Sequence, residues 1–183
     1  KIYVPHYYGV EHFGPPKQYK VSQGKDIDVN FIGTLRDYQE PVVNKFIHHC
    51  VTKQYGGGLL ELPCAWGKTS GSLYIFSKLK KKTIVIVHKE FLMNQWVERI
   101  QQFVPNARIG KIQASVMDVE NKDIVLCMLQ SLISKDYDPA IFEEFGLTII
   151  DEVHHISSQS FSNSLFKIVT KYMLDRKSTR LNS

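Results

Sequence analysis

Cysteine is scarce in this chain, and the cysteines that it has are far apart. Cys50, Cys64 and Cys127 form no Cys-x-x-Cys pair. This spacing argues against a zinc site of the usual kind and against a disulfide framework. A reducing compartment is therefore the expectation, which means an intracellular location, cytoplasmic or nuclear.

Long apolar runs are also missing. No stretch approaches the roughly 20 apolar residues that a membrane-spanning helix needs. The residues from Lys1 to Pro5 do not resemble a signal peptide, and the chain starts without methionine, so we expect it to begin inside a longer protein. No membrane partner is expected.

Charge of one sign is only mildly in excess. The formal net charge is +5, which permits a polyanionic partner but does not require one. The last nine residues, 175–183, match the in-frame translation of a common sequencing adapter, and without their three basic residues and one acidic residue the charge falls to +3. We expect this tail to be no part of the fold, so that the natural sequence ends at Leu174.

A phosphate-binding loop is the first feature that is clearly present. Residues 65–69 read Ala-Trp-Gly-Lys-Thr and follow an apolar run at 59–62, which predicts a strand, a tight loop and the start of a helix. In that geometry backbone N–H groups and the helix dipole converge on phosphate oxygens. Lys68 would add a positive charge for the outer phosphates, and the Thr69 hydroxyl could hold Mg²⁺.

Two carboxylates after a second apolar run complete the pattern. Asp151 and Glu152 follow the Leu-Thr-Ile-Ile run at 147–150. At the end of a buried strand, Asp151 could hold the water shell of the metal, and Glu152 could orient and deprotonate the attacking water. Together the two motifs predict an ATPase that uses ATP and Mg²⁺.

Each motif alone has a less specific explanation. Gly-Lys-Thr occurs often by chance, and Leu62 stands where the usual loop has its first glycine. Asp151 and Glu152 could be only the N-cap and first-turn charge of a helix. The order of the motifs and the strand-helix units between them favour the ATPase.

Strand-like and helical patterns alternate along the chain. Apolar runs predict strands at 83–87, 108–112, 123–128, 147–150 and from Tyr172, with a short one near 27–31. Apolar residues at helical spacing predict helices at 35–50, 70–79, 90–103, 130–134, 139–145 and 160–170. This alternation predicts an α/β fold whose mostly parallel central sheet is covered by helices on both faces. Ligands would bind at the carboxyl ends of its strands.

A third motif, Leu-Arg-Asp-Tyr-Gln at 35–39, precedes the phosphate loop. With it the set resembles the first RecA-like lobe of superfamily 2 helicases and translocases, over Leu35 to Leu174. Pro63 and Cys64 match the first two residues of the loop Pro-Cys-Gly-x-Gly-Lys-Ser/Thr. In this respect the chain resembles the group with that loop, which includes excision-repair and transcription helicases and relatives from large DNA viruses. The viral likeness adds a viral factory or virion to the expected locations.

The resemblance implies roles for further residues. Gln39 would read the adenine edge, because its amide both donates and accepts, with Arg36 in support. The nucleotide-binding set would be Arg36, Gln39, Pro63, Cys64, Ala65, Trp66, Gly67, Lys68, Thr69 and Ser70. Catalysis would involve Lys68, Asp151, Glu152 and His154, and the metal would be held by Thr69 and Asp151.

The resemblance also implies contacts to a nucleic-acid backbone, with DNA preferred to RNA. His88 and Lys89 follow the strand at 83–87 and are the main candidates for phosphate contact. Gln130 and Ser131 match a second backbone-contacting motif, and Gly110 and Lys111 match another more weakly. Trp96 lies on the apolar face of its helix, which favours a place in the core over base stacking.

One departure from the family pattern bears on affinity. Ala65 stands where glycine is usual, and its Cβ would crowd the phosphates or be penalised at a positive φ. We therefore expect weaker nucleotide binding.

The expected organisation has three parts. Residues 1–33 form a lead-in, residues 34–174 form the ATP-binding lobe, and residues 175–183 are the adapter-like tail. In the family, Tyr-Met-Leu continues with Gly-Leu-Ser-Ala-Thr, so we expect the chain to lack that coupling motif, the second lobe and its arginine finger. Since such a finger is worth about 10³–10⁵ in rate, the piece alone should be nearly inactive.

The sequence thus favours the ATP-binding lobe of a nucleic-acid helicase or translocase. Two alternatives are a P-loop kinase or nucleotide switch without nucleic acid, and an inert truncation that binds strands weakly. Stimulation of ATP hydrolysis by DNA or RNA would distinguish the first alternative.

Overall fold

A seven-stranded sheet forms the centre of the computed structural model, which describes residues 12–14, 21–53, 56–63, 65–153, 165 and 168–179. The strand order is β1-β7-β6-β2-β5-β3-β4. The strands are β1 (Gly56–Pro63), β2 (Thr83–Val87), β3 (Ile109–Gln113), β4 (Val116–Asp118), β5 (Ile124–Met128), β6 (Leu147–Asp151) and β7 (Tyr172–Thr179). Neighbours pair in parallel except β3 with β4, so the mostly parallel sheet expected from the sequence is confirmed.

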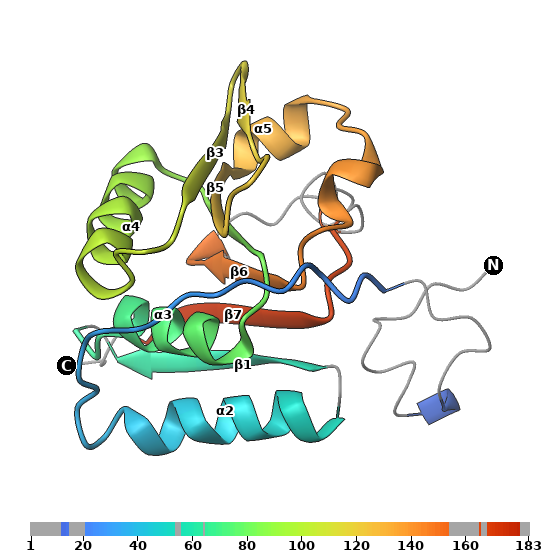
Figure 1. Cartoon of the computed structure of the whole chain (residues 1–183). Coiled ribbons are helices and arrows are strands. Elements are labelled where there is room, and N and C mark those ends of the chain that lie inside the picture. Colours follow the sequence, from blue (N-terminus) through green and yellow to red (C-terminus); the bar gives the residue numbers. More distant parts are fainter. Residues whose placement is uncertain are drawn as a thin grey trace.

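Helices cover both faces of this sheet (Figure 1). They are α2 (Glu40–Lys53), α3 (Lys68–Leu79), α4 (Glu90–Phe103), α5 (Leu129–Ser134) and the 3₁₀ helix η1 (Pro139–Phe142). α2, α3 and α4 pack on one face, whereas α5 and η1 pack on the other. The alternation of side chains along β2 shows this division: Val85 and Val87 join the first core, and Ile84 and Ile86 join the second.

Several elements differ from their sequence-based expectation. The lead-in near 27–31 forms no strand, and its nearest sheet-like contact is a single bridge between Asp26 and Lys81. α2 starts at Glu40, later than expected, because residues 37–39 form a turn. β1 starts at Gly56, earlier than the strand expected at 59–62, so the glycine run at 56–58 belongs to it. Most of the helix expected at 160–170 lies outside the described residues.

Strand β7 continues past Leu174, where the sequence analysis ends the lobe. It pairs in parallel with β1 on one side and with β6 on the other, and its register with β1 runs to Thr179. The adapter origin of residues 175–183 and the domain boundary remain predictions. In this structure, however, the strand carries Arg176 of the tail, whose side chain is buried next to the last residue of β6.

Two further expectations concern membranes and cysteines. No helix among the described residues is long and apolar enough to cross a membrane. Cys50 and Cys127 are buried and free, and burial raises the pKa of the Cys50 thiol to about 12. Cys64 lies outside the described residues.

Candidate nucleotide site

The phosphate loop connects β1 to α3 at the carboxyl edge of the sheet. Its backbone takes left-handed conformations at Ala65, with φ 63°, and at Gly67, with φ 85°. Gly67 is the N-cap of α3, so the first N–H groups of that helix are directed at the loop. Ala65 therefore adopts the positive φ that the sequence analysis considered, in a region where a Cβ is unfavourable.

The side chain of Gln39 holds this loop in place through hydrogen bonds. Its side chain is almost fully buried, and its Nε2 donates hydrogen bonds to the carbonyl of Trp66 at 2.7 Å and that of Gly67 at 3.4 Å. Its Oε1 accepts from the backbone N–H of Arg36 at 2.9 Å. A Cβ on Gly67 would lie 2.4 Å from Nε2, and the positive φ of 85° would strain any residue with a side chain, so glycine is required there. In this structure the Gln39 amide positions the loop, and its expected role in reading adenine stays a prediction.

The acidic strand end faces the loop across a short gap. Lys68 Nζ lies 3.2 Å from Glu152 Oε1, with both side chains largely buried. Glu152 has φ 55°, a strained conformation that directs it out of the line of β6. Lys68 and Glu152, which are 84 positions apart in the sequence, are therefore ion-paired beside the phosphate loop.

Asp151 is held by a tryptophan that sequence reasoning placed only in the core. Trp96 on α4 is 1% exposed, and its Nε1 donates to Asp151 Oδ2 at 2.8 Å. The buried indole N–H needs an acceptor, which is the one signal in the sequence that could have suggested such a partner. The bond fixes the orientation of the carboxylate.

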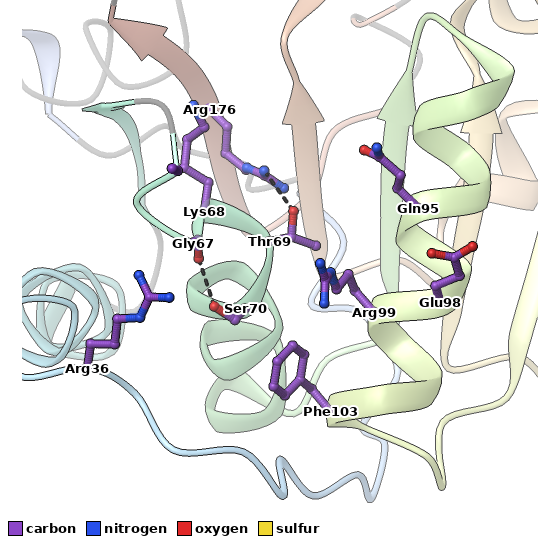
Figure 2. Close-up of a pocket in the computed structure, with 11 residues that line it drawn as sticks. Arg36, Gly67, Lys68, Thr69, Ser70, Gln95, Glu98, Arg99, Phe103 and Arg176 are labelled. Carbon is purple, nitrogen blue, oxygen red and sulfur yellow. Dashed lines mark hydrogen bonds between the residues drawn. The ribbon is translucent and has the colours of Figure 1, made fainter.

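Arg176 completes the cluster, and the sequence analysis did not include it. Its Nη2 lies 3.2 Å from Thr69 Oγ1 and 3.4 Å from Asp151 Oδ1, and its guanidinium carbon lies 4.9 Å from the centre of the Trp96 ring. Figure 2 shows the guanidinium beside the start of α3. Burial lowers the pKa of Arg176 from its ordinary value, and the carboxylates of Asp151 and Glu152 oppose that shift.

A cavity of about 490 Å³ opens beside this cluster. Its volume lies within the range of about 300–1,000 Å³ that is typical of ligand pockets. In Figure 2, the side chains of α4 face those of the loop and α3. The lining residues are Arg36, Ala65, Gly67, Lys68, Thr69, Ser70, Gln95, Glu98, Arg99, Phe103 and Arg176. Four basic side chains in this lining favour a polyanionic ligand.

Comparison with known proteins identifies the family. Residues 32–178 match the family described as "Type III restriction enzyme, res subunit". The chain belongs to this family. The resemblance to the first lobe of a superfamily 2 helicase is thereby confirmed.

Relatives of this family member include several viral proteins. It is 39% identical over 175 residues to a protein of Acanthamoeba polyphaga mimivirus named "Putative ATP-dependent RNA helicase", covering 94% of this chain and 33% of that protein. It is 28% identical over 167 residues to a "Putative helicase" of Invertebrate iridescent virus 3, covering 87% of this chain and 48% of that protein. The chain thus spans between a third and a half of these relatives.

A solved structure supports the fold of this restriction-enzyme family member. The ATPase core of a SWI2/SNF2 protein from Sulfolobus solfataricus, in complex with dsDNA, superposes with a TM-score of 0.69 at 20% sequence identity. The match covers 87% of this chain and 34% of that chain. The RecA-like α/β fold is therefore established.

The residues expected to contact nucleic acid fall into two groups in this family member. Gln130 Nε2 donates to the carbonyl of His88 at 2.9 Å, and the neighbouring Lys89 is exposed, so these three residues lie together at the carboxyl ends of β2 and β5. Ser131 is buried, and its Oγ accepts from the backbone N–H of Ala114 at 2.9 Å.

Gly110 and Lys111 lie apart from that group, within strand β3. A Cβ on Gly110 would lie 2.2 Å from the carbonyl oxygen of Asp118 on β4, so close packing of the two strands requires glycine there.

Two residues expected at the nucleotide site remain. The side chain of Ser70 forms a local hydrogen bond, since it donates to the carbonyl of Gly67 at 2.8 Å. His154, expected in catalysis, lies outside the described residues.

Proposed function

We propose that this chain is the ATP-binding lobe of an ATP-dependent nucleic-acid translocase or helicase. The observation that carries the proposal is the Lys68–Glu152 contact of 3.2 Å beside a basic cavity. It joins a phosphate loop at a helix N-terminus to a carboxylate at the end of a parallel strand. Ligands of open parallel sheets bind at this edge, and anions bind at such a helix terminus.

Two side chains and the start of α3 have roles in the proposed reaction. Lys68 binds the outer phosphates of ATP, and the N–H groups at the start of α3 bind the phosphate oxygens. Glu152 accepts a proton from the water that attacks the γ-phosphate. Its pairing with Lys68 places both side chains beside the phosphate loop.

Thr69 and Asp151 are the residues that would hold Mg²⁺. Hydroxyl and carboxylate oxygens are the donors that this ion prefers, and Asp151 Oδ1 accepts no hydrogen bond from the described residues. When bound, the metal would neutralise charge on the phosphate oxygens. In this chain the guanidinium of Arg176 contacts both donors.

The nucleic-acid partner is proposed from the chain's surface and its relatives. The group formed by His88, Lys89 and Gln130 presents a lysine and polar atoms at the strand ends, where phosphate contacts position a strand. One relative is named an RNA helicase and one structural neighbour holds dsDNA. We propose either strand type as substrate, with DNA preferred, and an intracellular location that includes a viral factory.

Substitution of Lys68 tests the nucleotide site. We expect Lys68→Ala to weaken binding of ATPγS about tenfold or more in isothermal titration calorimetry, because a charge-assisted hydrogen bond contributes about 1.5–3 kcal/mol. Lys78→Ala is the matched control, since Lys78 lies in the last turn of the same helix. The control should bind as the unchanged chain does.

Two results would count against the proposal. Equal affinity of the Lys68→Ala and Lys78→Ala variants would remove the phosphate loop from nucleotide binding. In a protein that carries both lobes, ATP hydrolysis that neither DNA nor RNA stimulates would favour a P-loop kinase or switch.

A further inference from the structure

An exposed aromatic side chain lies at the start of α4. Phe91 is in the first turn of this helix, and it is 55% exposed. The buried apolar residues of the same helix are at most 1% exposed; they are Met93, Trp96 and Ile100. A single exposed apolar residue is common on protein surfaces, so the exposure alone assigns no role to Phe91.

The neighbours of Phe91 are the residues proposed to contact phosphate. Lys89 is exposed, and its Nζ lies 5.8 Å from the centre of the Phe91 ring. Gln130 Nε2 donates to the carbonyl of His88, the residue before Lys89. The ring therefore adjoins the group formed by His88, Lys89 and Gln130.

We propose that Phe91 is a stacking platform for an unpaired base of the strand whose phosphates Lys89 contacts. The proposal rests on the proposed function, because it assumes a nucleic-acid partner. It adds the part of the nucleic acid that is bound, since phosphate contacts alone do not distinguish a single strand from a duplex. The expected consequence is that the chain binds single strands more tightly than duplexes.

The geometry of the lysine leaves the ring available. An ammonium attracts an aromatic face within about 6 Å of the ring centre, so Lys89 lies at the outer limit of this interaction. It covers at most one face of the ring. When Lys89 turns to a phosphate, a base can stack on the ring, and binding sites for single strands combine such a positive charge with such an aromatic surface.

The acidic residue between them in the sequence is engaged elsewhere. Glu90 Oε1 accepts a hydrogen bond from Gln113 Nε2, at the end of β3, at 3.4 Å. This contact draws the carboxylate toward the hairpin of β3 and β4. Lys89 therefore supplies the charge nearest to the ring, which suits a polyanionic strand.

The helix that carries the ring is fixed in place. The backbone N–H groups of Leu92 and Met93 donate to the carbonyl of Lys89 at 3.1 and 3.3 Å. One turn further along, Trp96 is bonded to Asp151 on β6. Because the platform is already ordered, stacking loses little conformational entropy on binding.

An unpaired base is the occupant that an aromatic ring selects. In a duplex both faces of a base are covered by its neighbours in the stack, whereas an unstacked base can lie on an aromatic side chain. Every base has such a face, so the platform should show little sequence preference.

The test pairs protein variants with a strand that lacks bases. The proteins are the unchanged chain, Phe91→Ala, Phe91→Tyr, Lys89→Ala and the control Val51→Ala. Val51 is also an exposed apolar residue, at 58%, but it lies on α2, which packs against β1 and α3. Fluorescence anisotropy measures the affinity of each protein for a labelled oligodeoxythymidine and for the same strand with abasic residues in its centre.

The expected pattern separates base stacking from phosphate contact. Phe91→Ala should weaken binding of the intact strand about fivefold or more, and that of the abasic strand less than about twofold. Phe91→Tyr and Val51→Ala should bind both strands as the unchanged chain does. Lys89→Ala should weaken binding of both strands and reduce the log–log salt slope by about 0.7, whereas Phe91→Ala should leave that slope unchanged. Thermal unfolding confirms that each variant is folded.

The outcomes that overturn the proposal are distinguishable. If Phe91→Ala binds the intact strand as the unchanged chain does, or weakens binding of both strands equally, Phe91 is not a base platform, while the effect of Lys89→Ala still supports the proposed function. Tighter binding of duplex than of single strand by the unchanged chain would also overturn the inference alone. Failure of the unchanged chain to bind any strand would overturn the proposed nucleic-acid partner and this inference together.

Discussion

At the scale of single residues, the sequence predicted which residues belong to the site better than it predicted which side chains contact one another. Lys68 and Thr69 line one cavity, and Glu152 and Asp151 lie beside it through their contacts with Lys68 and Arg176, because a strand-loop-helix unit and a parallel strand end at the same edge of a sheet. The bond from Trp96 to Asp151 could not be predicted. It depends on how α4 is rotated against β6, and an apolar helical stripe does not fix that rotation to within one hydrogen bond.

Ala65 offers a test of backbone strain at this scale. We expect Ala65→Gly to raise the free energy of unfolding by about 0.5–1 kcal/mol, because a left-handed conformation costs an L-residue about 1–2 kcal/mol and the added freedom of the unfolded chain returns about 0.4–1 kcal/mol. Urea denaturation measures the change. The affinity for ATPγS should rise in the same variant, since the loop loses a methyl group beside the phosphates.

Ala140→Gly is the matched control for this prediction. Ala140 lies in η1 and is not among the residues with positive φ. Glycine there should lower stability by about 0.5–1 kcal/mol. A loss of stability in both variants would refute strain at Ala65.

At the scale of elements, the long periodic segments were predicted and the short hairpin was not. The strand at Thr83–Val87 and the helix at Glu90–Phe103 appear as expected, because each combines a clear period with a buried face. β4 has three residues, all exposed, and its turn from β3 has Ala114 at φ 50°. With no glycine or asparagine in that turn and no buried face, the sequence carries no hairpin signal.

Gly110 tests whether that hairpin is a structural element in its own right. Because the added Cβ would meet backbone of β4, we expect Gly110→Ala to lower the free energy of unfolding by about 1–3 kcal/mol, the usual cost of overpacking. Gly58→Ala in β1 is the control, since its Cβ would lie 3.3 Å from the side chain of Phe46, which can move. Unchanged stability of Gly110→Ala, with weaker DNA binding, would instead assign Gly110 to a nucleic-acid contact.

At the scale of the whole molecule, the chain is one RecA-like lobe, and the relatives that it matches are longer proteins. It spans between a third and a half of the viral relatives described above, and 34% of the SWI2/SNF2 ATPase core. The fold class was predictable because alternating strands and helices admit few other arrangements. The contribution of β7 to the candidate nucleotide site was not predictable, because the sequence analysis assigned the second half of this strand to the adapter-like tail.

The central claim is that the phosphate loop and the acidic strand end form one nucleotide site. A crystal structure of the chain with ATPγS tests it most directly. The account predicts the γ-phosphate between Lys68 and Glu152, with Lys68 Nζ moved from Glu152 onto phosphate oxygens. Nucleotide bound at another place, with the Lys68–Glu152 ion pair intact, would contradict it.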